Sequence, residues 1–160
     1  MKQGCLLLVA TPIGNLGDIS QRAMQALAAA DRVVAEDTRH SGILLQHLGI
    51  KKPMLSFHEH SERERLERIV SMIERGERIA YVTDAGTPCI SDPGRLLVTA
   101  CHQRGLAIDA LPGPSAALCA LMLSGIECER FVFEGFLPAS GSARKKRLEQ
   151  VEAQPLTTIL

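Results

Sequence analysis

Hydrophobic residues along this chain form two alternating patterns: short continuous apolar runs, and stretches in which apolar positions recur every three or four residues. The first is typical of a strand buried on both faces, and the second of a helix that packs on one side. The runs predict strands at 5–11, 32–36, 53–58, 78–84 and within 106–113. The periodic stretches predict helices at 19–30, 40–49, 61–76, 95–105 and 114–126. Because strands and helices alternate on short connections, we expect an α/β fold with a mostly parallel sheet covered by helices.

Capping residues mark several of these helix ends. Asp18 or Ser20 precedes the first helix as its N-cap, and Ser61 with Glu64 has the spacing of a capping box at the third. Pro114 is expected at the first position of the fifth helix, where its missing N–H is tolerated. These signals support the boundaries that the apolar pattern indicates.

The pattern changes toward the end of the chain. A strand and loop at 130–138 precede a polar helix at 139–153, and a β-branched segment follows at 155–160. A strand formed by that last segment has no expected partner within the chain. We therefore predict an N-terminal α/β domain over residues 1–112 and the beginning of a second, truncated α/β domain over 113–160.

Composition narrows the class of protein. Eighteen basic and eighteen acidic side chains cancel, which excludes a basic field over the whole molecule but not a local basic patch. The five cysteines show no CxxC spacing and lie mostly in apolar surroundings, so reduced, buried thiols are expected. No apolar run approaches the ~20 residues of a membrane span, and the first residues do not fit a signal peptide. Together these features predict a cytoplasmic protein without a membrane segment.

Five loops follow the predicted strands, and all are dense in glycine, proline and short polar residues. They read TPIGNLGD, EDTRHS, FHEHSE, DAGTPCISDPG and LPGPSA. Ligands of open parallel sheets bind beyond these strand ends, so the loops predict a binding site along one rim of the sheet. Ordinary turns use the same residues, which leaves a purely structural interpretation open. The phosphate-binding patterns GxxxxGK and GxGxxG are absent, and His58 with His60 lacks a third ligand at suitable spacing, so no metal is expected.

The same loops carry a resemblance to a known family. TPIGNLGDIS, AEDTRHSGILLQHLGI, SDPG within VTDAGTPCISDPG, LPGPSA and FEGFLP resemble the bacterial 16S ribosomal RNA 2′-O-ribose cytidine methyltransferases (the small subunit methyltransferase I family), within the tetrapyrrole-methylase superfamily. The resemblance runs from Leu6 to Leu160. It implies a two-domain α/β enzyme, usually a homodimer, that binds S-adenosylmethionine between its domains and methylates a cytidine ribose of 16S ribosomal RNA in the small ribosomal subunit. Members are nearly twice this long, so we expect this stretch by itself to be inactive.

The resemblance also assigns loop residues to the cofactor. S-adenosylmethionine has no phosphates, so a stiff loop offering backbone amides and carbonyls suits it better than an anion cradle. Residues expected to bind it are Pro12, Gly14, Asp84, Ala85, Gly86, Thr87, Asp92, Ser115 and Ala116. The two aspartates offer bonds to ribose hydroxyls or negative potential near the sulfonium. For Asp92, N-capping of the next helix or an Asx turn is an equal alternative.

Ribose methylation needs alignment of two reactants and a base or cation near the developing alkoxide, because a 2′-hydroxyl is a poor acid. Glu36, Asp37 and Arg39 are the expected catalytic residues, with His58 and Glu59 as further candidates. The alternative for the acidic pair is capping of the next helix together with a salt bridge to Arg39.

RNA contacts are expected to be local, because the net charge is zero. Residues expected to meet phosphates are Arg39, Arg144, Lys145, Lys146 and Arg147. A solvated helix start is the alternative for the last four. Two rival functions remain open: a tetrapyrrole C-methyltransferase that uses the same cofactor, and a non-catalytic ligand-binding fragment.

Overall fold

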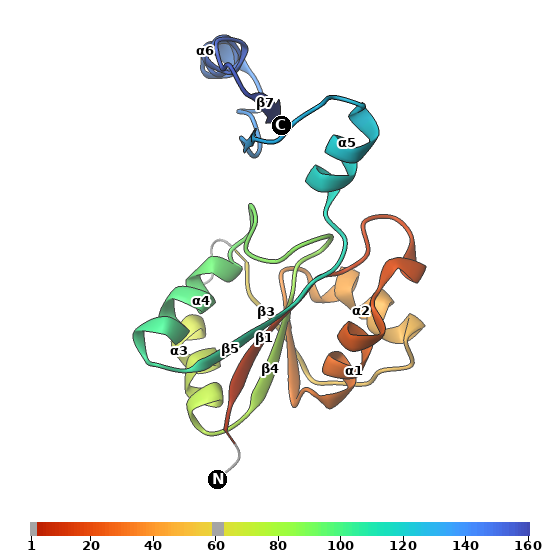
Figure 1. The fold of residues 1–160 in the computed structure, drawn as a ribbon. Coiled ribbons are helices and arrows are strands. Elements are labelled where there is room, and N and C mark those ends of the chain that lie inside the picture. The colour runs from red at the N-terminus through yellow and green to blue at the C-terminus, as the bar shows by residue number, and fades with distance from the viewer. Residues whose placement is uncertain (1–2, 59–62) are drawn as a thin grey trace. The chain divides into compact units, whose positions relative to one another are not determined.

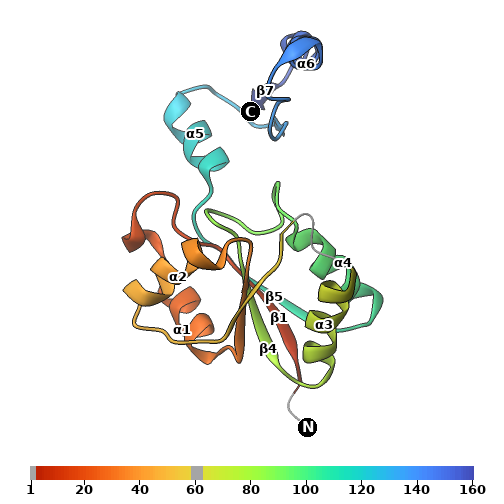
Figure 2. The same cartoon turned by 180° about the vertical axis from the view of Figure 1, so that it is seen from behind.

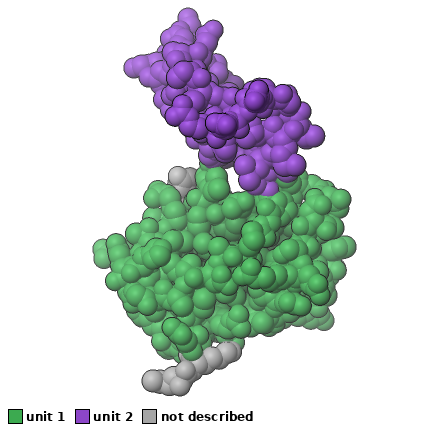
Figure 3. Space-filling model, in the orientation of Figure 1, with its two compact units in different colours: residues 1–114 green, residues 115–160 purple. Residues whose placement is uncertain are grey.

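The computed structural model describes residues 3–58 and 63–160, and the chain divides into two compact units, residues 1–114 and 115–160 (Figure 3). Ser61 of the expected capping box lies outside the described residues, as do Glu59 and His60. Each unit is described below by itself.

Unit 1 is built around a five-stranded, wholly parallel sheet with the strand order β3-β2-β4-β1-β5 (Figure 1). Its strands are β1 (Cys5–Val9), β2 (Arg32–Ala35), β3 (Met54–Ser56), β4 (Arg78–Val82) and β5 (Ala107–Leu111). Its helices are the 3-10 helix η1 (Leu16–Asp18), α1 (Gln21–Ala29), α2 (Thr38–His47), α3 (Arg63–Glu74) and α4 (Gly94–Gln103). This confirms the α/β fold class that the alternating pattern predicts.

Helices cover both faces of this sheet, α1 and α2 on one face and α3 and α4 on the other (Figures 1 and 2). Successive strand residues therefore enter different cores: Leu7 and Val9 pack with α1 and α2, whereas Leu6 packs with α3 and α4. A strand buried on both faces has no polar side to alternate with, which explains the continuous apolar runs in the sequence. Tyr81 of β4 is fully buried in the second core.

Unit 2 contains a helix followed by a β-α-β segment. Its elements are α5 (Ala116–Ser124), β6 (Phe131–Phe133), α6 (Gly141–Glu152) and β7 (Thr157–Ile159). β7 pairs in parallel with β6, so the expectation that the last segment lacks a partner is wrong. The pairing is possible because α6 carries the chain back to the start of β6, as a parallel pair requires. None of residues 115–160 is buried.

Two helix starts test the capping signals. Ser20 is the N-cap of α1, because its hydroxyl accepts a hydrogen bond from the Ala23 N–H at 3.1 Å. The placement of Pro114 at the first helical position is wrong, since α5 begins at Ala116 after an extended Ser115 with φ −142°. The Pro114 carbonyl instead accepts a hydrogen bond from Thr87, which holds this proline in the loop.

All five cysteines are free, but only Cys101 is buried, so the expectation of buried thiols is wrong for most of them. Burial raises the pKa of the Cys101 thiol to about 11, which keeps it protonated near neutral pH.

Within residues 3–58 and 63–160, none of the helices has the length and apolar character needed to cross a membrane.

Candidate functional site

The connections of the sheet diverge at its centre, where β1 and β4 lie side by side. The chain leaves β1 toward α1 on one face and leaves β4 toward α4 on the opposite face (Figures 1 and 2). Adjacent strands whose connections diverge in this way open a crevice beyond their carboxyl ends, where ligands of open α/β sheets bind. The candidate site therefore lies at the loops that follow Val9 and Val82.

The loop after β4 is hydrogen-bonded to three neighbouring loops. The backbone of Gly86 exchanges two N–H···O bonds with Thr11 after β1, at 2.9 and 3.1 Å. The Asp84 carboxylate accepts from the backbone N–H of the α2 N-cap, after β2, at 3.2 Å. The Thr87 hydroxyl donates to the Pro114 carbonyl, after β5, at 3.1 Å. These bonds hold the backbone of residues 84–87 in a defined position at the centre of the rim.

The second half of the same loop is fixed by the Asp92 carboxylate. It accepts hydrogen bonds from the Tyr81 hydroxyl at 3.0 Å and from the N–H groups of Cys89 and Gly94 at 2.6 Å each. The hydrogen bond from the N–H of Gly94, two residues after Asp92, forms an Asx turn. The Asx turn is one of the two structural alternatives for Asp92. Burial, reinforced by the nearby Asp92 carboxylate, raises the pKa of the Tyr81 hydroxyl far above its usual range, so this hydroxyl remains a proton donor.

Two residues of this loop adopt a backbone conformation that side chains disfavour. Cys89 and Ser91 have φ angles of 69° and 59°. Left-handed conformations of non-glycine residues cost on the order of 1 kcal/mol or more each and persist where surrounding contacts impose them. The hydrogen bonds to Asp92 are the contacts that impose them here, because Asp92 holds the loop on both sides of Ser91.

The acidic pair after β2 separates into two environments. Asp37 is the N-cap of α2, since its carboxylate accepts the Arg39 N–H at 2.8 Å and also pairs with the Arg39 guanidinium at 2.7 and 3.1 Å. Hydrogen bonds from Arg39 lower the pKa of Asp37 to about 2. Asp37 therefore has the structural role that the sequence left open as an alternative to catalysis: it caps α2 and forms a salt bridge with Arg39. Glu36, directly before it, is partly buried.

Replacing Arg39 with alanine is expected to raise the pKa of Asp37 from about 2 toward its ordinary value of 3.8. Because the folded-state pKa lies below the ordinary value, ionisation of Asp37 favours folding above that value, and this contribution is lost as the pH falls through about 2. Carboxyl NMR titration of the two proteins measures the shift. Arg22→Ala, which removes an exposed ion pair to Asp109, is the matched control and should leave the Asp37 titration unchanged.

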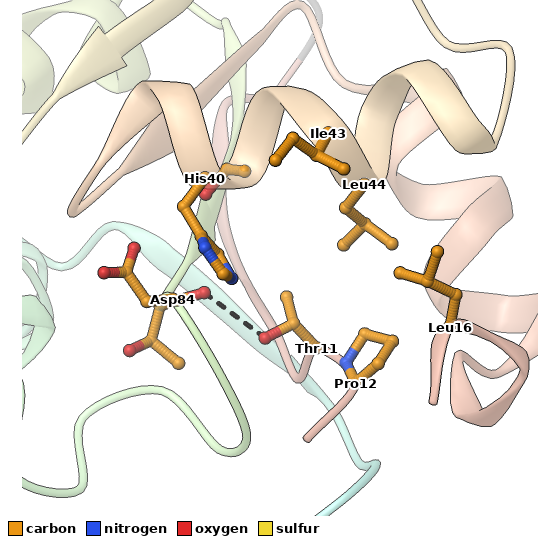
Figure 4. Close-up of a pocket in the computed structure, with 9 residues that line it drawn as sticks. Thr11, Pro12, Leu16, His40, Ile43, Leu44 and Asp84 are labelled. Atoms are coloured by element: carbon orange, nitrogen blue, oxygen red, sulfur yellow. Dashed lines mark hydrogen bonds between the residues drawn. The ribbon is translucent and has the colours of Figure 1, made fainter. Parts of the chain in front are cut away.

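A pocket of about 120 Å³ opens beside the point where the connections of β1 and β4 diverge, between α2 and the loops after these two strands (Figure 4). Its lining residues are Thr11, Pro12, Leu16, His40, Ser41, Ile43, Leu44, Thr83 and Asp84. His40 and Asp84 lie toward one end, whereas Leu16, Ile43 and Leu44 lie toward the other. The Thr11 hydroxyl donates to the Thr83 carbonyl at 3.2 Å across the floor between β1 and β4.

The structure brings two of the sequence-predicted cofactor residues, Pro12 and Asp84, into this pocket. The sequence interpretation missed Thr11, His40 and Ser41, although all three stand in or beside the quoted loop motifs. The available signal was helical spacing: residues 40, 41 and 44 share the side of α2 that faces the pocket.

The other predicted site residues occupy varied positions. Gly14 has φ 143° and open space around its α-carbon, and Ala85 is exposed at the rim. Ser115 and Ala116, at the start of α5, belong to unit 2. Their contribution to a cofactor site stays a prediction.

The basic run at the start of α6 divides into paired and solvent-facing side chains. Arg147 pairs with Glu134 and bonds to Gln150, and Arg144 donates to the Pro138 carbonyl at 3.1 Å. Lys145 and Lys146 are exposed.

Among the described residues, no group of three or more His, Cys, Asp or Glu side chains is arranged to hold a metal ion.

These features define a class: a parallel α/β protein with a candidate small-ligand site where the connections of its sheet diverge. Comparison with known proteins identifies the family. Residues 6–160 match the family described as Tetrapyrrole (Corrin/Porphyrin) Methylases, and the chain belongs to this family. This confirms the superfamily that the loop motifs indicated.

Relatives of known name support a narrower group. The chain is 52% identical to the ribosomal RNA small subunit methyltransferase I of Haemophilus influenzae, over 98% of this chain and 55% of that protein. It is 48% identical to the proteins of the same name from Escherichia coli O157:H7 and Pseudomonas aeruginosa, over 98% and 99% of this chain and 55% and 56% of those proteins. The chain therefore spans about half the length of the curated relatives it matches.

A solved structure supports the fold independently. The crystal structure of uroporphyrin-III C-methyltransferase from Thermus thermophilus superposes with a TM-score of 0.62 over 82% of this chain and 60% of that one. At 21% sequence identity, this likeness concerns the fold alone.

Proposed function

We propose that this chain forms the cofactor-binding part of an S-adenosylmethionine-dependent methyltransferase that modifies the 2′-hydroxyl of a cytidine ribose in 16S ribosomal RNA. The names of relatives that are 46–52% identical support ribosomal RNA of the small subunit as the substrate. Membership of a methylase family supports methyl transfer as the reaction. Because the chain matches about half of each relative, the proposal for this chain is limited to the cofactor-binding part of that activity.

The observation that carries this proposal is the loop at residues 84–87, which hydrogen bonds to three neighbouring loops and is called the triply bonded loop below. The Gly86 backbone bonds to the loop after β1, and the Asp84 and Thr87 side chains bond to the loops after β2 and β5. These anchors restrict the directions of the remaining backbone amide and carbonyl groups. A nucleoside with a cationic sulfonium and no phosphate is recognised by such groups without a helix N-terminal anion site. The carboxylates of Glu36 and Asp84 along the same rim supply negative potential that favours a positively charged ligand, whereas the charge of Asp37 is offset by its ion pair with Arg39.

When bound, S-adenosylmethionine supplies an activated methyl group. The chain's own contribution is alignment, because an in-line transfer depends mainly on holding two reactants in position away from water. Asp37, with a pKa of about 2, is too weak a base to take a proton from a ribose hydroxyl near neutral pH. We therefore assign Asp37 to positioning α2 and retain Glu36 as the candidate base and Arg39, whose side chain is 91% exposed, as the candidate cation for the alkoxide or a phosphate.

RNA contact and assembly complete the proposal. Lys145 and Lys146 are the preferred phosphate ligands of the basic run, because Arg144 and Arg147 are already engaged within unit 2. We also propose that the protein acts as a homodimer in the cytoplasm.

Calorimetry with S-adenosylmethionine tests the cofactor proposal on two glycine variants. Gly86 has φ 83°, and a β-carbon there would lie 3.3 Å from Ile13 Cγ2, so Gly86→Ala displaces the triply bonded loop. We expect at least about tenfold weaker binding, or 1.4 kcal/mol. Gly105→Ala is the matched control: its φ of 62° imposes similar backbone strain beyond the end of α4, with open space around it, and binding should be unchanged.

Turnover is measured after placing residues 6–160 in the matching stretch of the Haemophilus influenzae relative. Transfer of labelled methyl groups to small ribosomal subunits that lack the modification is the expected result. Labelling of uroporphyrinogen III in place of RNA, or equal effects of the two glycine variants on cofactor binding, would refute the proposal.

A further inference from the structure

We propose that the pocket beneath α2 holds the base of the acceptor nucleotide, a pyrimidine that carries an exocyclic amino group, and that Ser41 and Asp84 recognise its edge. This inference rests on the proposed methylation of cytidine and assigns a separate subsite to the base. Enzymes that act on a base within folded RNA or DNA commonly draw the nucleotide out of its stack and hold the base in a pocket, and the proposal extends this arrangement to a reaction at the ribose.

The first argument is an unsatisfied polar atom. Ser41 lines the pocket and is only 4% exposed, and its hydroxyl has no hydrogen-bond partner among the described residues. Buried hydroxyls are nearly always paired, because an unpaired one carries the full penalty of lost hydration. The Asp37 carbonyl, one turn earlier in the chain, already accepts the Ser41 backbone N–H at 3.0 Å. A polar ligand atom in the pocket would give this hydroxyl its missing partner.

The second argument is size. The pocket holds about 120 Å³. A protein cavity of about 150 Å³ accepts one benzene molecule. The space beneath α2 therefore suits a single six-membered ring that protrudes from its open side, whereas a tetrapyrrole macrocycle far exceeds it.

The third argument is the surface that a flat ring would cover. Leu16 and Ile43 at the pocket are 39% and 62% exposed, which is high for large apolar side chains, and Pro12 and Leu44 adjoin them (Figure 4). The faces of an extruded base are commonly held between apolar side chains. A ring in this pocket would remove these side chains from water while its polar edge reaches the opposite end, where His40 and Asp84 lie.

The fourth argument is the charge at that polar end. Asp84 Oδ1 accepts the Asp37 N–H, and Oδ2 has no donor among the described residues. A carboxylate pairs with the exocyclic amino group of cytosine, whereas uracil presents a carbonyl oxygen at the same position and is repelled. The Ser41 hydroxyl can donate to an acceptor of the ring. The two side chains thus select an amino-bearing pyrimidine.

The subsite also lies beside the proposed cofactor position. Thr83 and Asp84 line the pocket, and the backbone of the next three residues forms the triply bonded loop. A base seated in the pocket therefore places its ribose near the part of the rim where the methyl donor is proposed to bind.

The test uses cytidine and uridine as free nucleosides, whose lack of phosphate removes contributions from basic residues. Binding is followed by NMR through the imidazole signals of His40. We expect cytidine to shift these signals and to bind at least tenfold more tightly than uridine. Asp84→Asn should abolish this preference, since an amide both donates and accepts. Ser41→Ala should weaken cytidine binding about fivefold without lowering the Tm, because it removes an unpaired hydroxyl.

Ser71→Ala, on α3 over the opposite face of the sheet, is the matched control and should leave binding unchanged. Equal affinities for cytidine and uridine, or cytidine binding that is insensitive to Ser41→Ala, would overturn the subsite. The proposed function is judged separately by calorimetry with S-adenosylmethionine: normal cofactor binding with no cytidine preference refutes the subsite alone. Cytidine preference without cofactor binding refutes the methyltransferase assignment and leaves a nucleoside pocket.

Discussion

Replacing Gly94 with alanine is expected to lower the free energy of unfolding by about 3 kcal/mol, because the structure has no room for a methyl group at this position. A β-carbon built there would lie 2.3 Å from Tyr81 Cε1 and 2.8 Å from Asp92 Oδ1. The Tyr81 ring is fully buried between β4 and the helices of its face, so it has no space into which to move. Relief of the clash must come from a shift of α4 or of the loop before it.

Gly42→Ala is the matched control for this experiment. Gly42 lies inside α2, and a β-carbon there would meet nothing within 4 Å. Since glycine in a helix interior is about 0.5–1 kcal/mol worse than alanine, this variant should be slightly more stable than the parent protein. Urea unfolding followed by circular dichroism compares the two. Similar stability of both variants would contradict the close packing of Gly94 against Tyr81.

The sheet could be predicted from sequence because its physical causes are local. The central strands of unit 1, β1, β2 and β4, are buried on both faces, which produces largely apolar runs, and the helices have periodic apolar stripes facing the sheet. Alternation of the two implies parallel strands, and parallel strands place all their following loops on one rim. The location of the candidate site thus follows from pattern alone.

Pairing within unit 2 could not be predicted in the same way. The segment Thr157–Ile159 finds its partner in Phe131–Phe133, across an intervening helix. Both strands are short and neither is buried, so burial leaves no periodic signal to mark them as a pair. The last segment consequently looked unpartnered in the sequence.

The details of the site escaped prediction because they depend on contacts between distant residues. Asp92 had several equivalent interpretations until its distance to the Tyr81 hydroxyl, 3.0 Å, was known. Likewise, Ser41 attracts attention only once its hydroxyl is seen to be enclosed without a partner among the described residues. Residue type and spacing predict which loops gather, whereas burial and hydrogen-bond geometry distinguish a structural side chain from one that is available to a ligand.

Replacing Asp92 with alanine is expected to destabilise unit 1 by about 3 kcal/mol, because three hydrogen-bond donors lose their acceptor at once. One of them is the Tyr81 hydroxyl, on a side chain with no exposed surface, and the other two are the N–H groups of Cys89 and Gly94. The positive φ angles of Cys89 and Ser91 would also lose the contacts that impose them. Since the chain has one tyrosine and no tryptophan, intrinsic fluorescence reports on Tyr81 and its surroundings directly during unfolding.

A double-mutant cycle separates the Tyr81–Asp92 bond from other effects of the substitution. Tyr81→Phe alone should cost about 1 kcal/mol, because it removes the hydroxyl and its bond. In the Asp92→Ala background the same change should cost nothing or restore stability, since it then removes an unpaired buried donor. These two measurements follow unfolding by circular dichroism, as the phenylalanine variants lack the fluorophore. Asp109→Ala, which removes an exposed ion pair of 3.4 Å to Arg22, should change stability by less than about 1 kcal/mol. Additive effects of Tyr81→Phe and Asp92→Ala would mean that Asp92 stabilises the loop independently of Tyr81.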